Sequence, residues 1–192
     1  MKSWARYLLC AVAGIVAGSG AAVWTVKSGG FGSQARIGPW RTGTDFGSRD
    51  AGAYTRAVVA RNGLLALPAR EARYYTAASD DEGRPLEGRC RYRITGGAAG
   101  GAWWSLTLYG SDNFLVPNEA NIWSVGSAAL APAERKAWTI LAAPNRQPGH
   151  WLPTGGVENF DLTLRVYLPE GGGASNLSLE RLPRIARQSC AG

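Results

Sequence analysis

The stretch Ala102–Tyr109, AWWSLTLY, alternates between two kinds of side chain. Trp104, Leu106 and Leu108 share one face of an extended chain, whereas Thr107 lies on the other. A period of two is typical of a β-strand that turns one face to a core and the other to water. Because much of the remaining sequence follows the same pattern, this strand predicts a mainly β domain.

Further strands are expected on both sides of it. Phe160–Leu168 alternates just as strictly, with five apolar residues on one face. About seven short strands separated by Gly- and Pro-rich turns favour an antiparallel jelly-roll or β-sandwich domain. A short helix over Ala51–Asn62 is expected before the sheet. The expected strands are Ala72–Ala77, Arg89–Thr95, Ala102–Tyr109, Phe114–Val116, Ile122–Gly126, Trp138–Ala142 and Phe160–Leu168.

The N-terminal region contains a long uncharged segment. Tyr7–Val26 carries no formal charge and lies between Arg6 and Lys27. Twenty helical residues cover roughly 30 Å, the thickness of the hydrocarbon core of a bilayer. The segment therefore predicts a transmembrane helix that anchors the chain. A cleaved signal peptide is the alternative, because Gly20-Ala21-Ala22 provides small residues, although the usual apolar region of such a peptide is shorter.

The cysteines and the local composition predict the compartment and the parts of the rest of the chain. Cys10 lies within the apolar helix, which leaves Cys90 and Cys190 for one disulfide in an exported domain, with two free buried thiols as the alternative. The expected protein is a single-pass protein of the bacterial inner membrane with its C-terminal domain in the periplasm. Its parts are a cytoplasmic N-terminus (1–6), an anchor (7–26), a flexible tether rich in Gly and Ser (27–48) and a periplasmic β-rich domain (49–192).

The charge of the chain is strongly positive, but it is dispersed. The net charge is +7, yet no run of five to eight Lys and Arg residues occurs, so nucleic-acid binding is not expected. Arg89, Arg91 and Arg93 form the one regular basic stripe. An anionic partner, such as a glycan, a lipid or an envelope protein, is the hypothesis that this charge favours.

Several ordered blocks resemble one known family. They are Tyr74-Tyr75 through Tyr92, Trp103–Tyr109, Leu115–Asn118, Trp151–Thr154 and Leu162–Pro169. Together, over about residues 54–183, they resemble the family called domain of unknown function 1214, in its short membrane-anchored bacterial form. The resemblance implies a jelly-roll-like antiparallel fold and a Gram-negative envelope setting, but it implies no activity. Longer relatives carry a second domain of unknown function ahead of this one, and His150 stands where the family typically has Asn.

The sequence contains no strong catalytic signature. His150, its only histidine, can be drawn into a triad with Ser105 and either Asp112 or Asp161. Ser105, however, lacks the flanking glycines of a nucleophile elbow. One histidine and no Cys-x-x-Cys pair do not predict a metal site, and no cofactor is expected.

Arg165 is the most informative charged residue. It shares a strand face with Asp161 and Tyr167, so its guanidinium is predicted either to grip a ligand carboxylate beside an aromatic ring or to pair with Asp161 and stabilise the sheet. Trp104 and Trp151 fit a core as well as a ligand platform, and Asn118 fits a turn. The candidate ligand-binding residues are Arg165, Tyr167, Trp151, Trp104, Asn118 and Tyr75.

Three functions remain open from the sequence. The first is a non-catalytic envelope module that binds its partner through the Arg165 region or through the arginine stripe. The second is a small-molecule enzyme with a jelly-roll pocket around Arg165 and with Tyr75 or Tyr109 as polar contacts. The third is a structural subunit that forms a homodimer through Gly14 and Gly18, whose spacing suits close helix packing.

Overall fold

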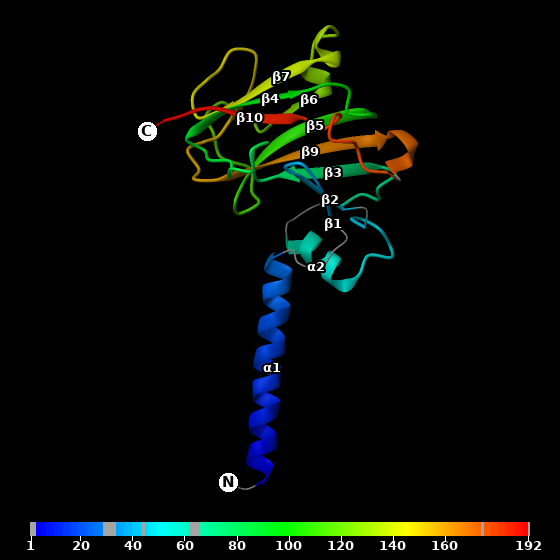
Figure 1. Ribbon diagram of the computed structural model, residues 1–192, viewed down its shortest axis with the longest axis vertical. Coiled ribbons are helices and arrows are strands. Elements are labelled where there is room, and N and C mark those ends of the chain that lie inside the picture. Colours follow the sequence, from blue (N-terminus) through cyan, green and yellow to red (C-terminus); the bar gives the residue numbers. More distant parts are fainter. Residues whose placement is uncertain (1–2, 29–33, 44, 62–65, 174, 192) are drawn as a thin grey trace.

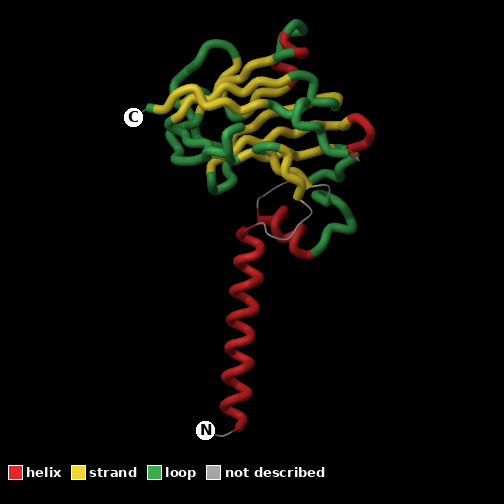
Figure 2. The backbone as a smooth tube through the Cα atoms, in the orientation of Figure 1, coloured by secondary structure: helices red, strands yellow, loops and turns green. Residues whose placement is uncertain are grey.

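The protein consists of one long helix and a β-rich body from which the helix projects (Figure 1). The computed structural model describes residues 3–28, 34–43, 45–61, 66–173 and 175–191. Figure 2 shows that strands and loops make up the body, that a short helix lies where the long helix leaves it, and that further short helical turns lie at the far end and the side of the body.

The projecting helix is α1 (Ser3–Ser28). Its segment Ser3–Val26 is strongly apolar and is almost entirely uncovered by the rest of the protein. This helix is long and apolar enough to cross a membrane, and it includes the predicted Tyr7–Val26. Gly14 and Gly18 have open space beside them, which leaves room for a second helix. Dimerisation through this face stays a prediction.

The body contains two β-sheets. The larger sheet has the spatial order β1 (Gln34–Ile37), β2 (Trp40–Gly43), β3 (Ala72–Ala77), β9 (Phe160–Pro169), β5 (Gly101–Gly110) and β6 (Ser124–Gly126). The smaller sheet has the order β10 (Arg184–Cys190), β4 (Cys90–Gly96), β7 (Trp138–Ala143) and β8 (His150–Pro153). Helix α2 (Ala53–Arg61) precedes β3, and short 3-10 turns lie at η1 (Ser127–Ala129), η2 (Glu134–Lys136) and η3 (Glu170–Gly173).

Neighbouring strands run antiparallel except for β7 and β8, which are parallel. The predicted mainly β, mainly antiparallel fold with an N-terminal apolar helix and a short helix before β3 is therefore confirmed. The jelly-roll form of the sandwich stays a prediction.

The core lies between the two sheets. Trp104 of the larger sheet stacks on Trp138 of the smaller one, with ring centroids 4.6 Å apart, and Phe160 meets Tyr92 edge to face at 5.6 Å. Stacked and edge-to-face geometries are the favourable ones for aromatic pairs, so these two contacts join the sheets by more than area alone. The apolar faces that the alternating pattern predicted for β5 and β9 form this core, with one exception. The prediction was wrong for Leu168, whose positive φ of 46° breaks the alternation and whose side chain is 64% exposed.

The expected strand Phe114–Val116 does not form. Leu115 makes only an isolated bridge to Tyr109, and the Phe114 side chain is 73% exposed. Asn113 has a positive φ of 67°, and the Gly110 N–H donates to the Phe114 carbonyl, so the chain turns tightly where the strand was expected to begin. Three residues are too few to overcome this turn.

Residues 34–43 correct the prediction of a flexible tether over 27–48. They form the hairpin β1–β2, which extends the larger sheet next to β3. Trp40 is fully buried, and its Nε1 donates to the Pro183 carbonyl at 2.8 Å. The Gly-rich composition favoured a flexible tether, although the stretch also contains Trp40, whose large side chain is buried against the body. Residues 29–33 and 44 of the predicted tether lie outside the described residues.

Two further strands, β8 and β10, were not expected from the sequence. Most side chains of β10 are exposed and show no clear alternation, and β8 is short and ends at Pro153. The predicted Cys90–Cys190 disulfide is present, and it joins β10 to β4 at the end of their register. Cys10 is a free, exposed thiol on α1.

Candidate functional site

The side of the larger sheet that faces away from the core carries a group of polar and aromatic side chains. Because side chains alternate along a strand, the residues next to the core residues of β5 and β9 all point to this side. We call it the outer face, and its central pairs in register are Trp103 with Tyr167, Ser105 with Arg165, Thr107 with Thr163, and Tyr109 with Asp161.

Arg165 lies across the middle of the outer face. Its Nη1 donates to the Thr107 hydroxyl at 3.0 Å, and its Nη2 donates to the Tyr109 hydroxyl at 2.6 Å. The guanidinium carbon also lies 5.3 Å from the centre of the Tyr109 ring, a cation–π distance. The expected pair with Asp161 is not formed, because the side chain reaches sideways to β5 instead of along its own strand. Throughout the described parts of the chain, Arg165 has only these neutral partners.

Asp161 lies at one end of this row. Burial raises the pKa of its carboxyl group above the usual range, and the nearby charge of Arg41 opposes this shift. No described residue donates a hydrogen bond to the Asp161 carboxylate. The outer face therefore carries the Asp161 carboxylate at one end, which accepts no hydrogen bond from a described residue, and the Arg165 guanidinium at its centre, whose described partners are neutral.

An aromatic pair lies at the opposite end. The rings of Trp103 and Tyr167 are tilted by 50° with centroids 5.0 Å apart, and Trp103 is 39% exposed. A depression of about 350 Å³ adjoins Trp103, and Arg135 and Leu130 contribute to its lining. An exposed aromatic ring beside a guanidinium can pack on the apolar side of a sugar or a similar flat ligand.

The other predicted ligand residues lie elsewhere. Trp104 belongs to the core. Trp151 lies on β8 in the smaller sheet, where its Nε1 donates to the Ala143 carbonyl at 3.0 Å. Only Arg165 and Tyr167, of the six candidates, share the outer face.

Asn118 and Tyr75 have local partners of their own. The Asn118 amide donates to the carbonyls of Val116 and Ile122 and accepts from the Ile122 N–H, which is the behaviour expected of a turn former. Tyr75 faces the interior, and its hydroxyl accepts a hydrogen bond from the Leu177 N–H at 3.0 Å.

The structure does not assemble a catalytic triad around His150. The His150 Nε2 lies 3.2 Å from a carboxylate oxygen of Glu134, on the side of the smaller sheet, whereas Ser105 lies on the larger sheet. The pKa of Glu134 lies below its usual range, mainly because its carboxylate accepts a hydrogen bond from the Ala131 N–H and secondly because of its contact with His150. This pair fastens η2 to β8.

The predicted arginine stripe lies on β4 of the smaller sheet. Arg89 donates to the Glu87 carboxylate at 2.9 Å, Arg91 is half-buried and Arg93 is exposed. Arg93 is thus the exposed arginine of the stripe for which no described residue forms an ion pair, and it serves as a control for Arg165.

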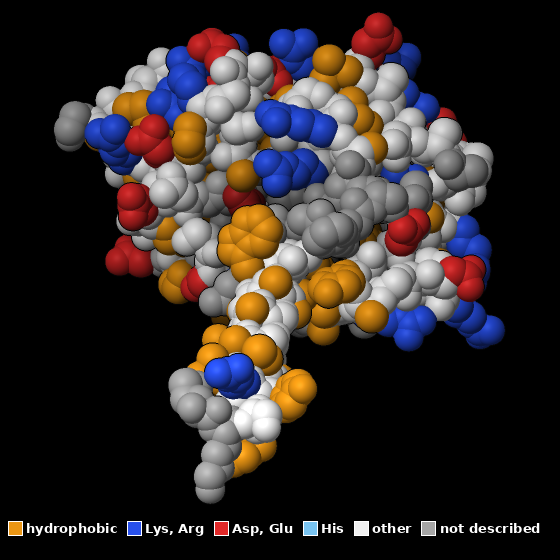
Figure 3. Space-filling view, turned by 60° about the horizontal axis from the view of Figure 1, so that its bottom comes forward, with side chains coloured by type: hydrophobic (Ala, Val, Ile, Leu, Met, Phe, Trp, Pro, Cys, Tyr) orange, Lys and Arg blue, Asp and Glu red, His pale blue; other side chains and the backbone are white. Residues whose placement is uncertain are grey.

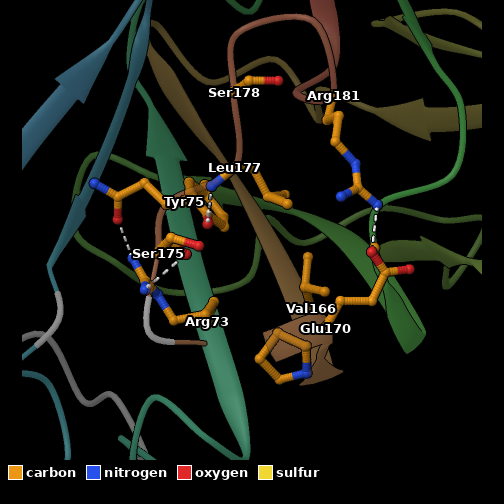
Figure 4. Close-up of a pocket in the computed structure, with 11 residues that line it drawn as sticks. Arg73, Tyr75, Val166, Glu170, Ser175, Leu177, Ser178 and Arg181 are labelled. Atoms are coloured by element: carbon orange, nitrogen blue, oxygen red, sulfur yellow. Dashed lines mark hydrogen bonds and ion pairs between the residues drawn. The ribbon is translucent and has the colours of Figure 1, made fainter. Parts of the chain in front are cut away.

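A cavity lies at the end of the sandwich where β9 finishes and the chain crosses to β10 (Figure 4). Its volume is about 280 Å³, and it is lined by residues of β3, the end of β9 and the connection that follows η3. Arg73 of β3 lines it and is only 1% exposed. Sequence reasoning missed this residue, although an arginine that shares a strand face with Tyr75, two positions further along, was a signal that could have found it. Arg165 does not line this cavity.

Comparisons with known proteins identify relatives without an assigned activity. The family described as "Protein of unknown function (DUF1214)" matches residues 71–171. A solved protein from Vibrio parahaemolyticus is 25% identical, with a TM-score of 0.57 over 73% of this chain and 36% of that chain. An uncharacterised protein from Burkholderia cenocepacia is 18% identical, with a TM-score of 0.44 over 63% of this chain and 30% of that chain. This chain thus spans about a third of the length of these two solved proteins, and no curated protein matches it.

Proposed function

Because this chain belongs to the DUF1214 family of proteins of unknown function, we propose a function from the geometry of its own residues. The protein is a membrane-anchored envelope protein whose domain lies in the periplasm and binds an acidic saccharide through the outer face. The binding is not catalytic.

The anchoring half of the proposal is supported by α1. Apolar side chains lie along this helix, and Lys and Arg side chains lie on the surface of the domain near the point from which it projects (Figure 3). An exposed apolar helix of this length is costly in water and favourable in a bilayer. The disulfide between Cys90 and Cys190 supports an oxidising compartment for the domain.

One observation carries the binding half: Arg165 is held in a fixed position by two neutral groups, Thr107 and Tyr109. A guanidinium whose partners are hydroxyls keeps its full charge for a ligand, whereas one paired with a carboxylate does not. Because its rotamer is already set, little side-chain entropy is lost when an anion binds. Trp103 and Tyr167, two strand positions away, supply the aromatic surface on which a sugar ring packs.

The binding proposal is tested with the full-length protein in detergent micelles. The probes are oligogalacturonate, which is acidic, and a neutral dextran oligosaccharide of similar length, each titrated at constant ionic strength. We expect oligogalacturonate to bind and dextran to bind at least tenfold more weakly. Arg165→Gln should weaken oligogalacturonate binding by about tenfold or more, because a charge-assisted contact contributes roughly 1.5–3 kcal/mol.

The matched control is Arg93→Gln, which removes an exposed arginine from the smaller sheet. This variant has the same net charge as Arg165→Gln, so it reports the effect of overall charge alone. Equal losses in the two variants, or a loss only in Arg93→Gln, would contradict the outer face as the binding site. Trp103→Ala should weaken binding without changing its dependence on salt.

The location is tested in cells. Alkaline carbonate should leave the full-length protein in the membrane fraction, and protease added to spheroplasts should digest the domain while intact cells protect it. Extraction by carbonate, or protection of the domain in spheroplasts, would refute a periplasmic domain on a membrane anchor.

A further inference from the structure

We propose that the cavity around Arg73 is a second binding site, separate from the outer face, and that it takes a small organic carboxylate with an apolar body. Arg73, Tyr75 and Val166 lie on the interior side of the larger sheet, opposite to Arg165. The two sites are therefore divided by the sheet itself.

Arg73 is a buried cation without an acidic partner. Its Nη1 donates to the carbonyls of Gly173, at 2.6 Å, and Ser175, at 3.4 Å. Its Nη2 donates to the Thr42 hydroxyl at 3.2 Å and to the amide oxygen of Asn176. All four acceptors are neutral, and within the described ranges no carboxylate forms an ion pair with Arg73.

Such an arrangement is unusual for a side chain that is 1% exposed. Arginine is almost never fully buried unless it is paired, because an unpaired charge loses its hydration without compensation. The hydrogen bonds explain how Arg73 holds the connection after η3, but neutral acceptors leave its charge uncompensated. The Tyr75 ring, with its centre 5.7 Å from the guanidinium carbon, provides only partial compensation.

One N–H of the guanidinium is also unused. The Arg73 Nε is buried, and none of the described residues accepts a hydrogen bond from it. A buried donor without an acceptor costs roughly 1–3 kcal/mol. A carboxylate in the cavity would place the missing negative charge beside this guanidinium.

The rest of the cavity indicates the shape of the ligand. Val166, Pro169 and Leu177 give it an apolar wall, and Arg181 lies on the other side from Arg73 (Figure 4). Arg181 pairs with Glu170 at 3.0 Å, and both side chains are exposed, so this pair forms a rim that can open to solvent. About 280 Å³ lies at the lower limit of small-molecule pockets. The geometry therefore points to a short aliphatic or aromatic monocarboxylate.

The test uses thermal unfolding of the full-length protein in detergent, with benzoate as the probe and benzamide as its neutral counterpart, at constant ionic strength. At a benzoate concentration of about 100 times its Kd, the midpoint should rise by about 5–10 °C. Benzamide should leave it unchanged. Sulfate serves as a further arm, because an equal rise with sulfate would show a site for inorganic anions and overturn the proposed carboxylate with an apolar body.

Two variants locate the effect. Arg73→Met should abolish the rise with benzoate. Because Arg73 also holds the connection after η3, Ser178→Trp provides an independent variant: Ser178 lines the cavity with an exposed side chain that makes no described hydrogen bond, so an indole there blocks the entrance and leaves Arg73 in place. Ser178→Ala is its matched control and should respond like the native protein.

Absence of a rise in the native protein, or a full rise in Ser178→Trp, would overturn the cavity as the site. Arg165→Gln should respond to benzoate normally, and Ser178→Trp should bind oligogalacturonate normally. Failure of one site is therefore distinguishable from failure of the other.

Discussion

Loss of the Cys90–Cys190 disulfide is expected to have a large and measurable effect. The bond closes a loop with a sequence separation of 100 residues. In the loop-entropy model a loop of this length contributes about 4.7 kcal/mol to the free energy of unfolding. β10 is an edge strand whose side chains are mostly exposed, and Ile185 is its one fully buried side chain. Because little other packing holds β10 in place, we expect the disulfide to contribute most of this value.

The measurement compares the native protein with the Cys90→Ala, Cys190→Ala double variant in urea, with tryptophan fluorescence as the signal. The variant should lose about 3–5 kcal/mol, and its thermal midpoint should fall by about 10–20 °C. Cys10→Ala is the matched control, because Cys10 is a free thiol on the exposed helix and should contribute almost nothing. A loss below about 1 kcal/mol in the double variant, or alkylation of both thiols in native protein purified without reductant, would refute the reasoning.

Four other substitutions test the packing, the electrostatics and the backbone strain. Trp40→Phe should destabilise the domain by about 1–3 kcal/mol in urea unfolding, because the Pro183 carbonyl loses its buried donor; a change near zero would mean that β1–β2 is not part of the folded unit. Burial raises the pKa of Asp161 in the folded state above its value in the unfolded chain. The stability associated with this group is therefore fully present below the pKa of the unfolded chain, and it is lost as the pH rises through the folded pKa. Asp161→Asn should therefore raise the thermal midpoint at neutral pH and leave it unchanged near pH 3, and the opposite order would contradict the burial argument. Gly88→Ala places a Cβ against the carbonyl of Val157 and should cost about 1–3 kcal/mol, whereas Gly83→Ala, with open space at its Cβ but a positive φ, should show a cost from backbone strain alone.

The amino-acid order alone predicted the elements whose signal is local. Tyr7–Val26 lacks charges over a bilayer thickness, and strands β5 and β9 alternate strictly, so each reveals its structure within its own residues. The disulfide could be predicted because only two cysteines lie outside the apolar helix. Hydrophobic periodicity is sufficient to predict a helix or a strand of this kind, since the apolar residues that will be buried are all within one segment.

Features that depend on distant segments could not be predicted in this way. Trp40 anchors a hairpin in a Gly-rich stretch because Pro183, far along the chain, accepts its N–H. Arg165 was recognised as important, but its partners were decided by the register between β9 and β5, which offers Tyr109 in place of Asp161. Arg73 became a candidate only when the fold placed a connection of the chain over its guanidinium. Strand pairing and cavity formation arise from contacts across long separations, and a periodic pattern within one segment carries no information about which segment will lie beside it.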